Sequence, residues 1–185
     1  MKRPLELAHD FLAQVITKDD VVVDATMGNG YDTLFLAKLA KQVYAFDIQE
    51  QALEKTSQRL QEAGLTNVKL LLQGHETVDQ FATEVKAAIF NLGYLPSADK
   101  SIITQPQTTL DALDKLCHML VKGGRIAIMI YYGHEGGDIE RDAVMDFVSH
   151  LPQQEYTATI YRTLNQINNP PFLVMIEKLE RYRHG

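Results

Sequence analysis

The sequence predicts an α/β fold: a mostly parallel seven-stranded sheet with helices on both faces and an antiparallel last strand. Two observations lead to this prediction. Short apolar strand segments alternate with helical segments over residues 1–150, a pattern that requires a parallel sheet covered on both faces. The last two strand segments follow one another with no helix between them, so they can pair antiparallel at one side of the sheet.

The elements of the first half follow from their apolar spacing. Leu5–Ile16 has helical spacing of apolar residues, with Pro4 in a plausible first turn. The second long helix is expected to end before Gly64, a typical residue at a helix C-terminus. The remaining predicted elements, in order, are the strand Val21–Val23, the helix Asp32–Lys41, the strand Gln42–Ile48, the helix Gln49–Ala63, the strand Val68–Leu72 and the helix His75–Val85.

The second half continues the alternation and then changes it. Lys86–Phe90 is a short apolar run that predicts a buried fourth strand. The pair Gly123-Gly124 is expected to stop the next helix, and Asp138 to cap the one after it. The elements predicted here are the helix Gln105–Val121, the strand Arg125–Tyr132, the helix Ile139–His150 and the strands Glu155–Thr163 and Phe172–Glu177.

Bulk properties limit the class of protein. The 185 residues are expected to form one domain, residues 1–185, with a core of its own. There is no apolar run of membrane length and no signal-peptide pattern, and the single cysteine fits a reducing cytoplasm. The net charge of −6 argues against broad non-specific nucleic-acid binding. Two basic clusters are either a local RNA contact or solvated terminal charge: Lys2 with Arg3, and Lys178 with Arg181 and Arg183.

A glycine-rich loop follows the first predicted strand. Gly28 and Gly30 permit a tight turn, but Thr33 stands where the dinucleotide fingerprint requires a third glycine. Carboxylates at Asp24 and Asp32 would repel a pyrophosphate and suit an ammonium group. S-adenosylmethionine, which has a sulfonium and an amino group and no phosphate, fits this loop better than a dinucleotide.

The next two strands carry signals in the order that such a cofactor needs. Asp47 ends the second strand about 20 residues after the glycine loop, where an acid binds the ribose hydroxyls. Gly74-His75 ends the third strand, near the expected adenine; Asp47 and His75 are alternatively helix caps. Together the signals predict a class I, Rossmann-like methyltransferase fold. The predicted cofactor-binding residues are Asp24, Met27, Gly28, Asn29, Gly30, Asp32, Thr33, Asp47, Gln49, Gly74, His75 and Asn91.

The segment after the fourth strand indicates the methyl acceptor. Amino methyltransferases often carry Asn/Asp-Pro-Pro-Tyr/Phe at this place, where the amide accepts a hydrogen bond from the target amine and the ring stacks on the base. Asn91, Gly93 and Tyr94 form a relaxed version of this motif. The alternative is an asparagine that bonds its own turn and a tyrosine on the rim. The sole cysteine, Cys117, lies in the middle of a predicted helix, which favours N- or O-methylation over cysteine-dependent carbon methylation.

Weaker candidates lie elsewhere. Asn168 and Asn169 precede Pro170-Pro171 between the last two strands, and they either face the substrate from the opposite wall or belong to a rigid hairpin turn. His134, in a glycine-rich loop, is either a base or an inert surface residue. The same holds for His9, which either closes over the site or is solvated. The polar loop 101–106 is a candidate RNA contact. The histidines lack the spacing of metal ligands, so no metal is expected.

Over nearly its whole length the chain resembles a family of small bacterial methyltransferases labelled rRNA methylases. The matching segments are Asp24–Thr33, Phe46–Gln49, Gly74–His75, Asn91–Pro96, Ile130–Gly133 and Ile167–Phe172. Members of the family are implicated in methylating 5-aminomethyl-2-thiouridine at the tRNA wobble position. The resemblance implies that reaction and, with it, the tRNA anticodon stem-loop as partner. The predicted catalytic residues are Asn91, Tyr94, His134 and Asn169. An rRNA base, a small-molecule amine or a non-catalytic S-adenosylmethionine-binding module are the alternatives, and a homodimer is left open.

Overall fold

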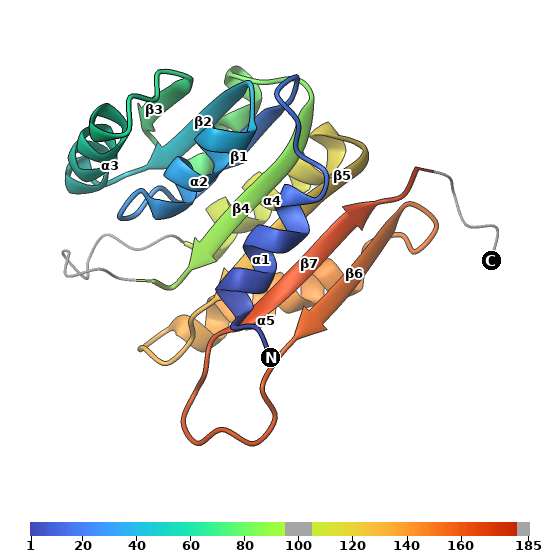
Figure 1. The fold of residues 1–185 in the computed structure, drawn as a ribbon. Helices are drawn as coiled ribbons and strands as arrows, with labels where there is room; N and C mark the ends of the chain where they lie inside the picture. The colour runs from blue at the N-terminus through green and yellow to red at the C-terminus, as the bar shows by residue number, and fades with distance from the viewer. Residues whose placement is uncertain (95–104, 181–185) are drawn as a thin grey trace.

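The computed structural model describes residues 1–94 and 105–180, and its centre is a seven-stranded sheet with the order β3-β2-β1-β4-β5-β7-β6 (Figure 1). β1 to β5 pair in parallel, while β7 runs antiparallel to both of its neighbours. β6 therefore runs in the same direction as β1 to β5. The predicted fold class is confirmed, including the antiparallel last strand.

The elements follow one another in the predicted order. The helices are α1 Pro4–Ala13, α2 Tyr31–Leu39, α3 Glu50–Glu62, the 3₁₀ helix η1 His75–Gln80, α4 Pro106–Met119 and α5 Gly137–Ser149. The strands are β1 Val21–Asp24, β2 Gln42–Asp47, β3 Val68–Leu72, β4 Val85–Leu92, β5 Leu120–Ile130, β6 Tyr156–Tyr161 and β7 Phe172–Lys178. Within the described residues, no helix is long and apolar enough to span a bilayer.

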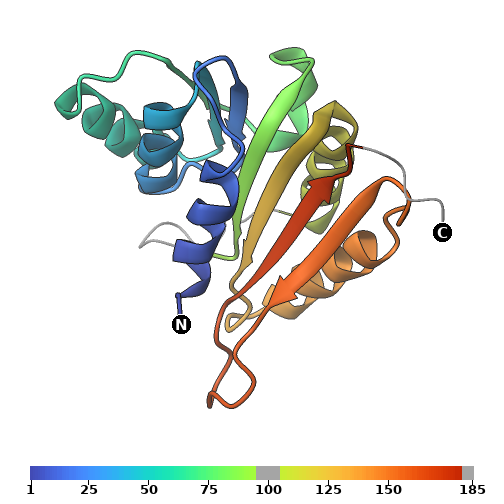
Figure 2. The ribbon, with the colours of Figure 1, turned by 45° about the vertical axis from the view of Figure 1, so that its right-hand side comes forward.

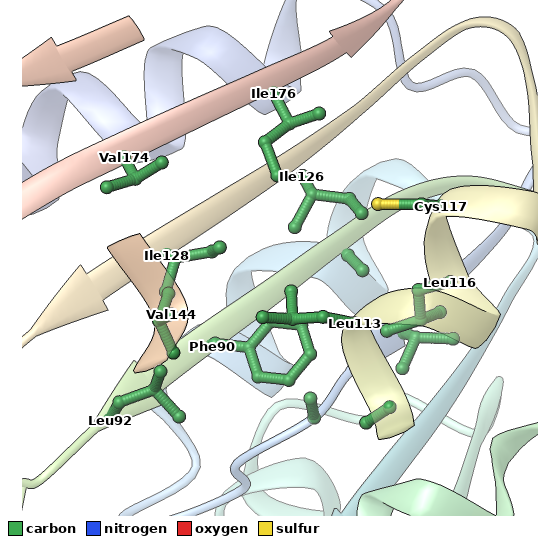
Figure 3. Packing of buried hydrophobic residues seen from close by; sticks show 14 of the residues in the cluster. Phe90, Leu92, Leu113, Leu116, Cys117, Ile126, Ile128, Val144, Val174 and Ile176 are labelled. Atoms are coloured by element: carbon green, nitrogen blue, oxygen red, sulfur yellow. The ribbon is translucent and has the colours of Figure 1, made fainter. Parts of the chain in front are cut away.

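Both faces of the sheet are covered, which is why its central strands are almost continuously apolar. One buried cluster joins the sheet to η1, α4 and α5, and the other joins it to α1, α2 and α3. The two layers of helices are visible on either side of the sheet in Figure 2. In Figure 3, Phe90 of β4 lies against Leu113 of α4, and both are fully buried. Cys117 belongs to the same core, where burial raises the pKa of its thiol to about 12.

Helix α1 packs on the sheet over β5 and β7 (Figure 1). The Arg125 guanidinium of β5 donates through Nη1 to the Phe11 carbonyl at 2.8 Å and to Gln14 Oε1 at 2.7 Å. At the other end of the helix, Tyr161 Oη of β6 donates to the Lys2 carbonyl at 2.7 Å. These bonds hold both ends of α1, so its side chains have a defined place above the sheet.

Three of the predicted boundaries that differ from the structure have an identifiable cause. The predicted helix His75–Val85 is a 3₁₀ helix that ends at Gln80. It buries only His75 and Val78, and a helix with three residues per turn places these two on one side. The helix before β5 ends at Met119 and not at Val121, so Gly123-Gly124 lies inside the strand.

The glycine pair has a packing role in that strand. The pairing of β4 with β5 shifts between Val85 and Ala87, which marks an irregularity of the bulge type. At Gly124 a Cβ would lie 2.9 Å from the Lys86 carbonyl oxygen, so the two strands approach closely only because this side chain is absent. The third wrong boundary is the cap of α5, which is Gly136 and not Asp138. Asp138 lies in the first turn, where its charge still faces the positive end of the helix dipole.

Candidate active site

A cavity of about 440 Å³ opens where β1, β2, β4 and β5 end. The chain leaves β1 toward β2 on one side and reaches β4 on the other, so this is the switch point at which open α/β sheets bind ligands. The predicted site residues that line the cavity are Met27, Gly28, Asn29, Gly30, Asp32, Asp47, Gln49, Asn91, Tyr94 and His134.

Asp47 joins two loops beneath the cavity. Its Oδ2 accepts a hydrogen bond from the Gly28 N–H at 3.0 Å, and its Oδ1 accepts one from the Gln49 N–H at 2.9 Å. Gln49 is the N-cap residue of α3, so the capping role and a ligand role are compatible. Burial raises the pKa of Asp47, and the backbone N–H groups oppose that rise. Each carboxylate oxygen has a second lone pair, which suits the two hydroxyls of a ribose.

The wall beside Asp47 is apolar and suits a nucleobase. Ile48 is 44% exposed and Ala52 lies one helical turn further on, and both line the cavity together with Met27. The nucleoside of S-adenosylmethionine needs hydrogen-bond acceptors for its ribose hydroxyls and an apolar surface for its adenine, and the Asp47 carboxylate lies next to such a surface. The residues present therefore fit this cofactor.

Asp24 lies beneath the loop and does not line the cavity. It is fully buried; Thr33 Oγ1 donates to its Oδ2 at 2.6 Å, and the Thr26 N–H donates to its Oδ1 at 3.1 Å. Burial, and then the nearby Asp32 charge, raise the pKa of Asp24 to about 8. Asp24 and Thr33 therefore shape the glycine loop from below. Thr26 Oγ1 in turn accepts the Asn91 N–H at 2.6 Å, which ties the end of β4 to this loop.

The other half of the cavity is aromatic and polar. The Tyr94 and Tyr131 rings lie 5.4 Å apart at 50°, and Tyr94 is 48% exposed. Burial, followed by the Asp32 charge, raises the pKa of Tyr131. His134 lies close to the backbone turn at Gly93. A Cβ added at Gly93 would be only 2.6 Å from His134 Cε1. Tyr94, Tyr131 and His134 thus line an opening of the cavity that suits a flat ring.

Sequence reasoning missed two residues of this half. Tyr131 lies just after β5, and Glu140 of α5 lines the cavity while its Oε2 accepts the Thr109 hydroxyl of α4 at 2.9 Å. The end of β5 was a detectable signal for Tyr131, since strand ends carry sites in such folds. No such signal exists for Glu140, which in the sequence is one of several acidic residues in the first turns of a helix.

Five predicted residues do not line the cavity: Asp24, Thr33, Gly74, His75 and Asn169. His75 is buried, its Nδ1 donates to the Ala25 carbonyl at 3.0 Å, and burial lowers its pKa. Asn169 is exposed on the loop after β6, which extends beyond the same sheet edge because β6 runs with β1 to β5 (Figure 1). A Cβ on Gly133 would lie 3.7 Å from Asn169 Cβ, so this loop stands beside the loop that carries His134.

Some predicted segments lie outside the described residues. They are Leu95 and Pro96, most of the polar loop 101–106, and Arg181 with Arg183. Gln105 and Pro106, at the end of that loop, do line the cavity. Within residues 1–94 and 105–180, no group of three His, Cys, Asp or Glu side chains is arranged to hold a metal ion.

Comparisons with known proteins agree with this geometry. The family model described as "Putative rRNA methylase" matches residues 43–177. A chloroplastic tRNA (mnm(5)s(2)U34)-methyltransferase of Arabidopsis thaliana is 38% identical over 96% of this chain and 70% of its own length.

Solved structures of similar proteins extend the match to the whole fold. A Streptococcus mutans protein described as a "putative methyltransferase", crystallised in complex with SAH, is 60% identical with a TM-score of 0.92, over 97% of this chain and 99% of its own. An rRNA methylase from Streptococcus thermophilus is 54% identical with a TM-score of 0.86 over the same shares of the two chains. SAH is what S-adenosylmethionine becomes after it donates its methyl group, so these matches assign the cofactor.

Proposed function

The chain belongs to the family described as "Putative rRNA methylase" and is an S-adenosylmethionine-dependent methyltransferase; on that premise, we propose that it methylates the amine of 5-aminomethyl-2-thiouridine at the wobble position of tRNA. The product is 5-methylaminomethyl-2-thiouridine. The observation that carries the proposal is the Asn91 side chain, which lines the cavity beside the exposed Tyr94 ring. The name of the Arabidopsis thaliana relative supports this choice of acceptor.

The proposed roles follow from what each side chain offers. S-adenosylmethionine supplies an electrophilic methyl group on its sulfonium. Asp47 and the apolar wall at Ile48 hold the nucleoside of the cofactor. Asn91 accepts a hydrogen bond from the acceptor amine and thereby orients the lone pair of the amine nitrogen toward the methyl group. This alignment accelerates methyl transfer without any covalent bond to the protein.

The acceptor half of the cavity holds the base and removes a proton. Tyr94 stacks on the uracil ring, as aromatic side chains do with extruded bases. An alkylammonium must lose a proton before its nitrogen can attack, and His134 is the imidazole that lines this half. Asn169, on the loop beside that of His134, contacts the substrate from outside the cavity lining. The wobble base is unpaired in the anticodon loop, so its extrusion costs little.

The proposal extends to the partner and the compartment. The anticodon stem-loop is the proposed partner, and the cytoplasm, where its tRNA is found, is the proposed location. The single-domain organisation over residues 1–185 is part of the same proposal, because one cavity combines the cofactor wall and the acceptor wall.

The test is nucleoside mass spectrometry. Purified protein and S-adenosylmethionine are incubated with tRNA from a strain that lacks the corresponding gene, and rRNA from the same strain serves as a competing acceptor. We expect 5-aminomethyl-2-thiouridine to disappear as its methylated form appears, and Asn91→Ala to slow this conversion about 100-fold. An unmodified tRNA profile, or methyl transfer to the rRNA instead, contradicts the proposed acceptor.

A further inference from the structure

Helix α1 places a histidine against Asp32, a residue that lines the cavity. His9 Nε2 lies 2.6 Å from Asp32 Oδ1, and the imidazole is stacked on the Phe35 ring of α2 with centroids 4.0 Å apart and planes at 7°. The side chains of His9 and Asp32 are only 25% and 8% exposed. A carboxylate accepts hydrogen bonds, so Nε2 is the protonated nitrogen of His9 and its N–H donates a hydrogen bond to Asp32.

The second oxygen of Asp32 faces the amide of Asn91. Asn91 Nδ2 donates to Asp32 Oδ2. An amide has a donor end and an acceptor end, so this bond turns Oδ1 away from Asp32. A flipped amide would place an acceptor oxygen against a carboxylate oxygen, which is repulsive. With Asp32 held in place, the Asn91 amide has one favoured orientation.

Two other titratable groups lie near Asp32. Burial, and then the Asp32 charge, raise the pKa of Asp24 of β1. The same two causes raise the pKa of Tyr131, which follows β5 and stays neutral. The Asp32 carboxylate accepts two hydrogen bonds, one from His9 of α1 and one from Asn91 of β4.

The place of His9 is set by other parts of the molecule. Arg125 and Tyr161 tie the two ends of α1 to β5 and β6. Phe35 fixes the plane of the ring. His9 therefore does not need a ligand to take up its position.

We propose that His9 is a positioning residue for methyl transfer: it fixes the Asp32 carboxylate, which holds the Asn91 amide with its oxygen toward the acceptor amine. The inference rests on the proposed function, since it assigns the acceptor to Asn91 Oδ1. It adds α1 to the machinery, although α1 precedes the residues that the family model matches.

Two variants separate the hydrogen bond from the packing. His9→Phe keeps a ring to stack on Phe35 and lacks the donor, whereas His9→Gln keeps an N–H donor and lacks the ring. We expect His9→Phe to lower kcat at least about tenfold, the scale of a lost hydrogen bond to a charged group, with the KM for tRNA and the Kd for S-adenosylmethionine within about twofold. His9→Gln should recover most of that loss.

The control is His118→Ala. His118 is another histidine paired with an aspartate, Asp114, but its side chain is 77% exposed and outside the cavity. It should behave as the wild type. Thermal unfolding of each variant shows whether the fold is retained. A larger kcat loss for His9→Gln than for His9→Phe, or a weakened cofactor affinity with unchanged kcat, overturns the proposal.

A double-mutant cycle tests whether His9 acts through Asn91. In an Asn91→Ala background, His9→Phe should cause no further loss of kcat, because the amide that it positions is gone. Multiplying effects, as expected for independent sites, overturn the proposal.

A spectroscopic measurement makes the proposal testable without any acceptor. The side-chain amide ¹⁵N–¹H signals of Asn91, assigned by comparison with Asn91→Ala, should shift in His9→Phe and return toward the wild type in His9→Gln. Unchanged signals in His9→Phe overturn the inference. If these signals shift in His9→Phe but tRNA is not methylated, the proposed acceptor is wrong, while the positioning of Asn91 by His9 and Asp32 still holds.

Discussion

Asp47 is the residue on which we expect cofactor binding to depend most directly. Its carboxylate bonds the first and second loops of the cavity and offers further lone pairs to a ribose. We expect Asp47→Ala to weaken S-adenosylmethionine binding about 100-fold or more in titration calorimetry, because two charge-assisted hydrogen bonds and the loop ties are lost.

A graded control separates the two effects of that change. Asp47→Asn keeps one acceptor oxygen for a loop N–H and loses the charge, so it should fall between the wild type and Asp47→Ala. Asp79→Ala, at an exposed carboxylate of η1 paired with Lys115, should leave the affinity unchanged. Unaltered binding by Asp47→Ala would remove Asp47 from the cofactor site.

The buried carboxyl of Asp24 should make the stability of the fold depend on pH. Its pKa in the folded protein is raised to about 8, chiefly by burial, from an ordinary value of 3.8. A carboxyl whose folded pKa is raised stabilises the fold below its ordinary pKa, and this contribution is lost as the pH rises through about 8. Asp24→Asn imitates the protonated carboxyl and cannot ionise.

The wild type should therefore lose stability as the pH rises, whereas Asp24→Asn should not lose this contribution. Relative to the wild type, Asp24→Asn should gain stability as the pH is raised from 5 to 8.5, by on the order of 4 kcal/mol. Denaturant unfolding at both pH values measures it. A stability difference between the two proteins that does not change with pH would show that Asp24 does not titrate in this range.

At the scale of elements, the turn after β4 depends on a residue without a side chain. Gly93 has φ +78°, and a Cβ there would lie 2.0 Å from the Tyr131 carbonyl oxygen, a backbone atom that follows β5. The ends of β4 and β5 are thereby brought together at the acceptor half of the cavity. This close approach places Tyr94 next to Tyr131.

Gly93→Ala is expected to reduce the free energy of unfolding by about 3 kcal/mol, from backbone strain and the clash together. Gly136→Ala is the matched control, because Gly136 has φ +81° and nothing within 4 Å of an added Cβ. It should lose only about 1 kcal/mol, the cost of the backbone conformation. Equal losses in chemical denaturation would mean that the contact with Tyr131 carries no energy.

For the whole molecule, the net charge of −6 limits how the proposed tRNA substrate can be held. Affinity for a nucleic acid depends on the number of phosphates neutralised, and an acidic protein neutralises few of them. An isolated anticodon stem-loop is therefore expected to be methylated with a KM within about threefold of that for full-length tRNA, with a weak dependence on salt. A KM more than tenfold higher for the stem-loop would point to contacts with the rest of the tRNA.

Periodicity predicted the order and type of the elements because it depends on neighbours three, four or two residues away. One error occurred where a contact between distant segments set the boundary, and another where a local backbone conformation did. Gly123-Gly124 resembles the end of a helix, but the close approach of Lys86 places it inside β5. The cap of α5 moved to Gly136, because a glycine there adopts the left-handed conformation that starts the helix.

The fold class, the glycine loop and the position of the Asn91 motif could be predicted from the order of the residues, because residues at successive strand ends of a parallel sheet must meet at one edge. Which side chains share the cavity depends on how the helices pack against that sheet. His9 reaches Asp32 because α1 folds back over the sheet, and Glu140 enters from α5 through helix packing. Such contacts join residues far apart in the chain, and no local pattern encodes the packing that brings them together.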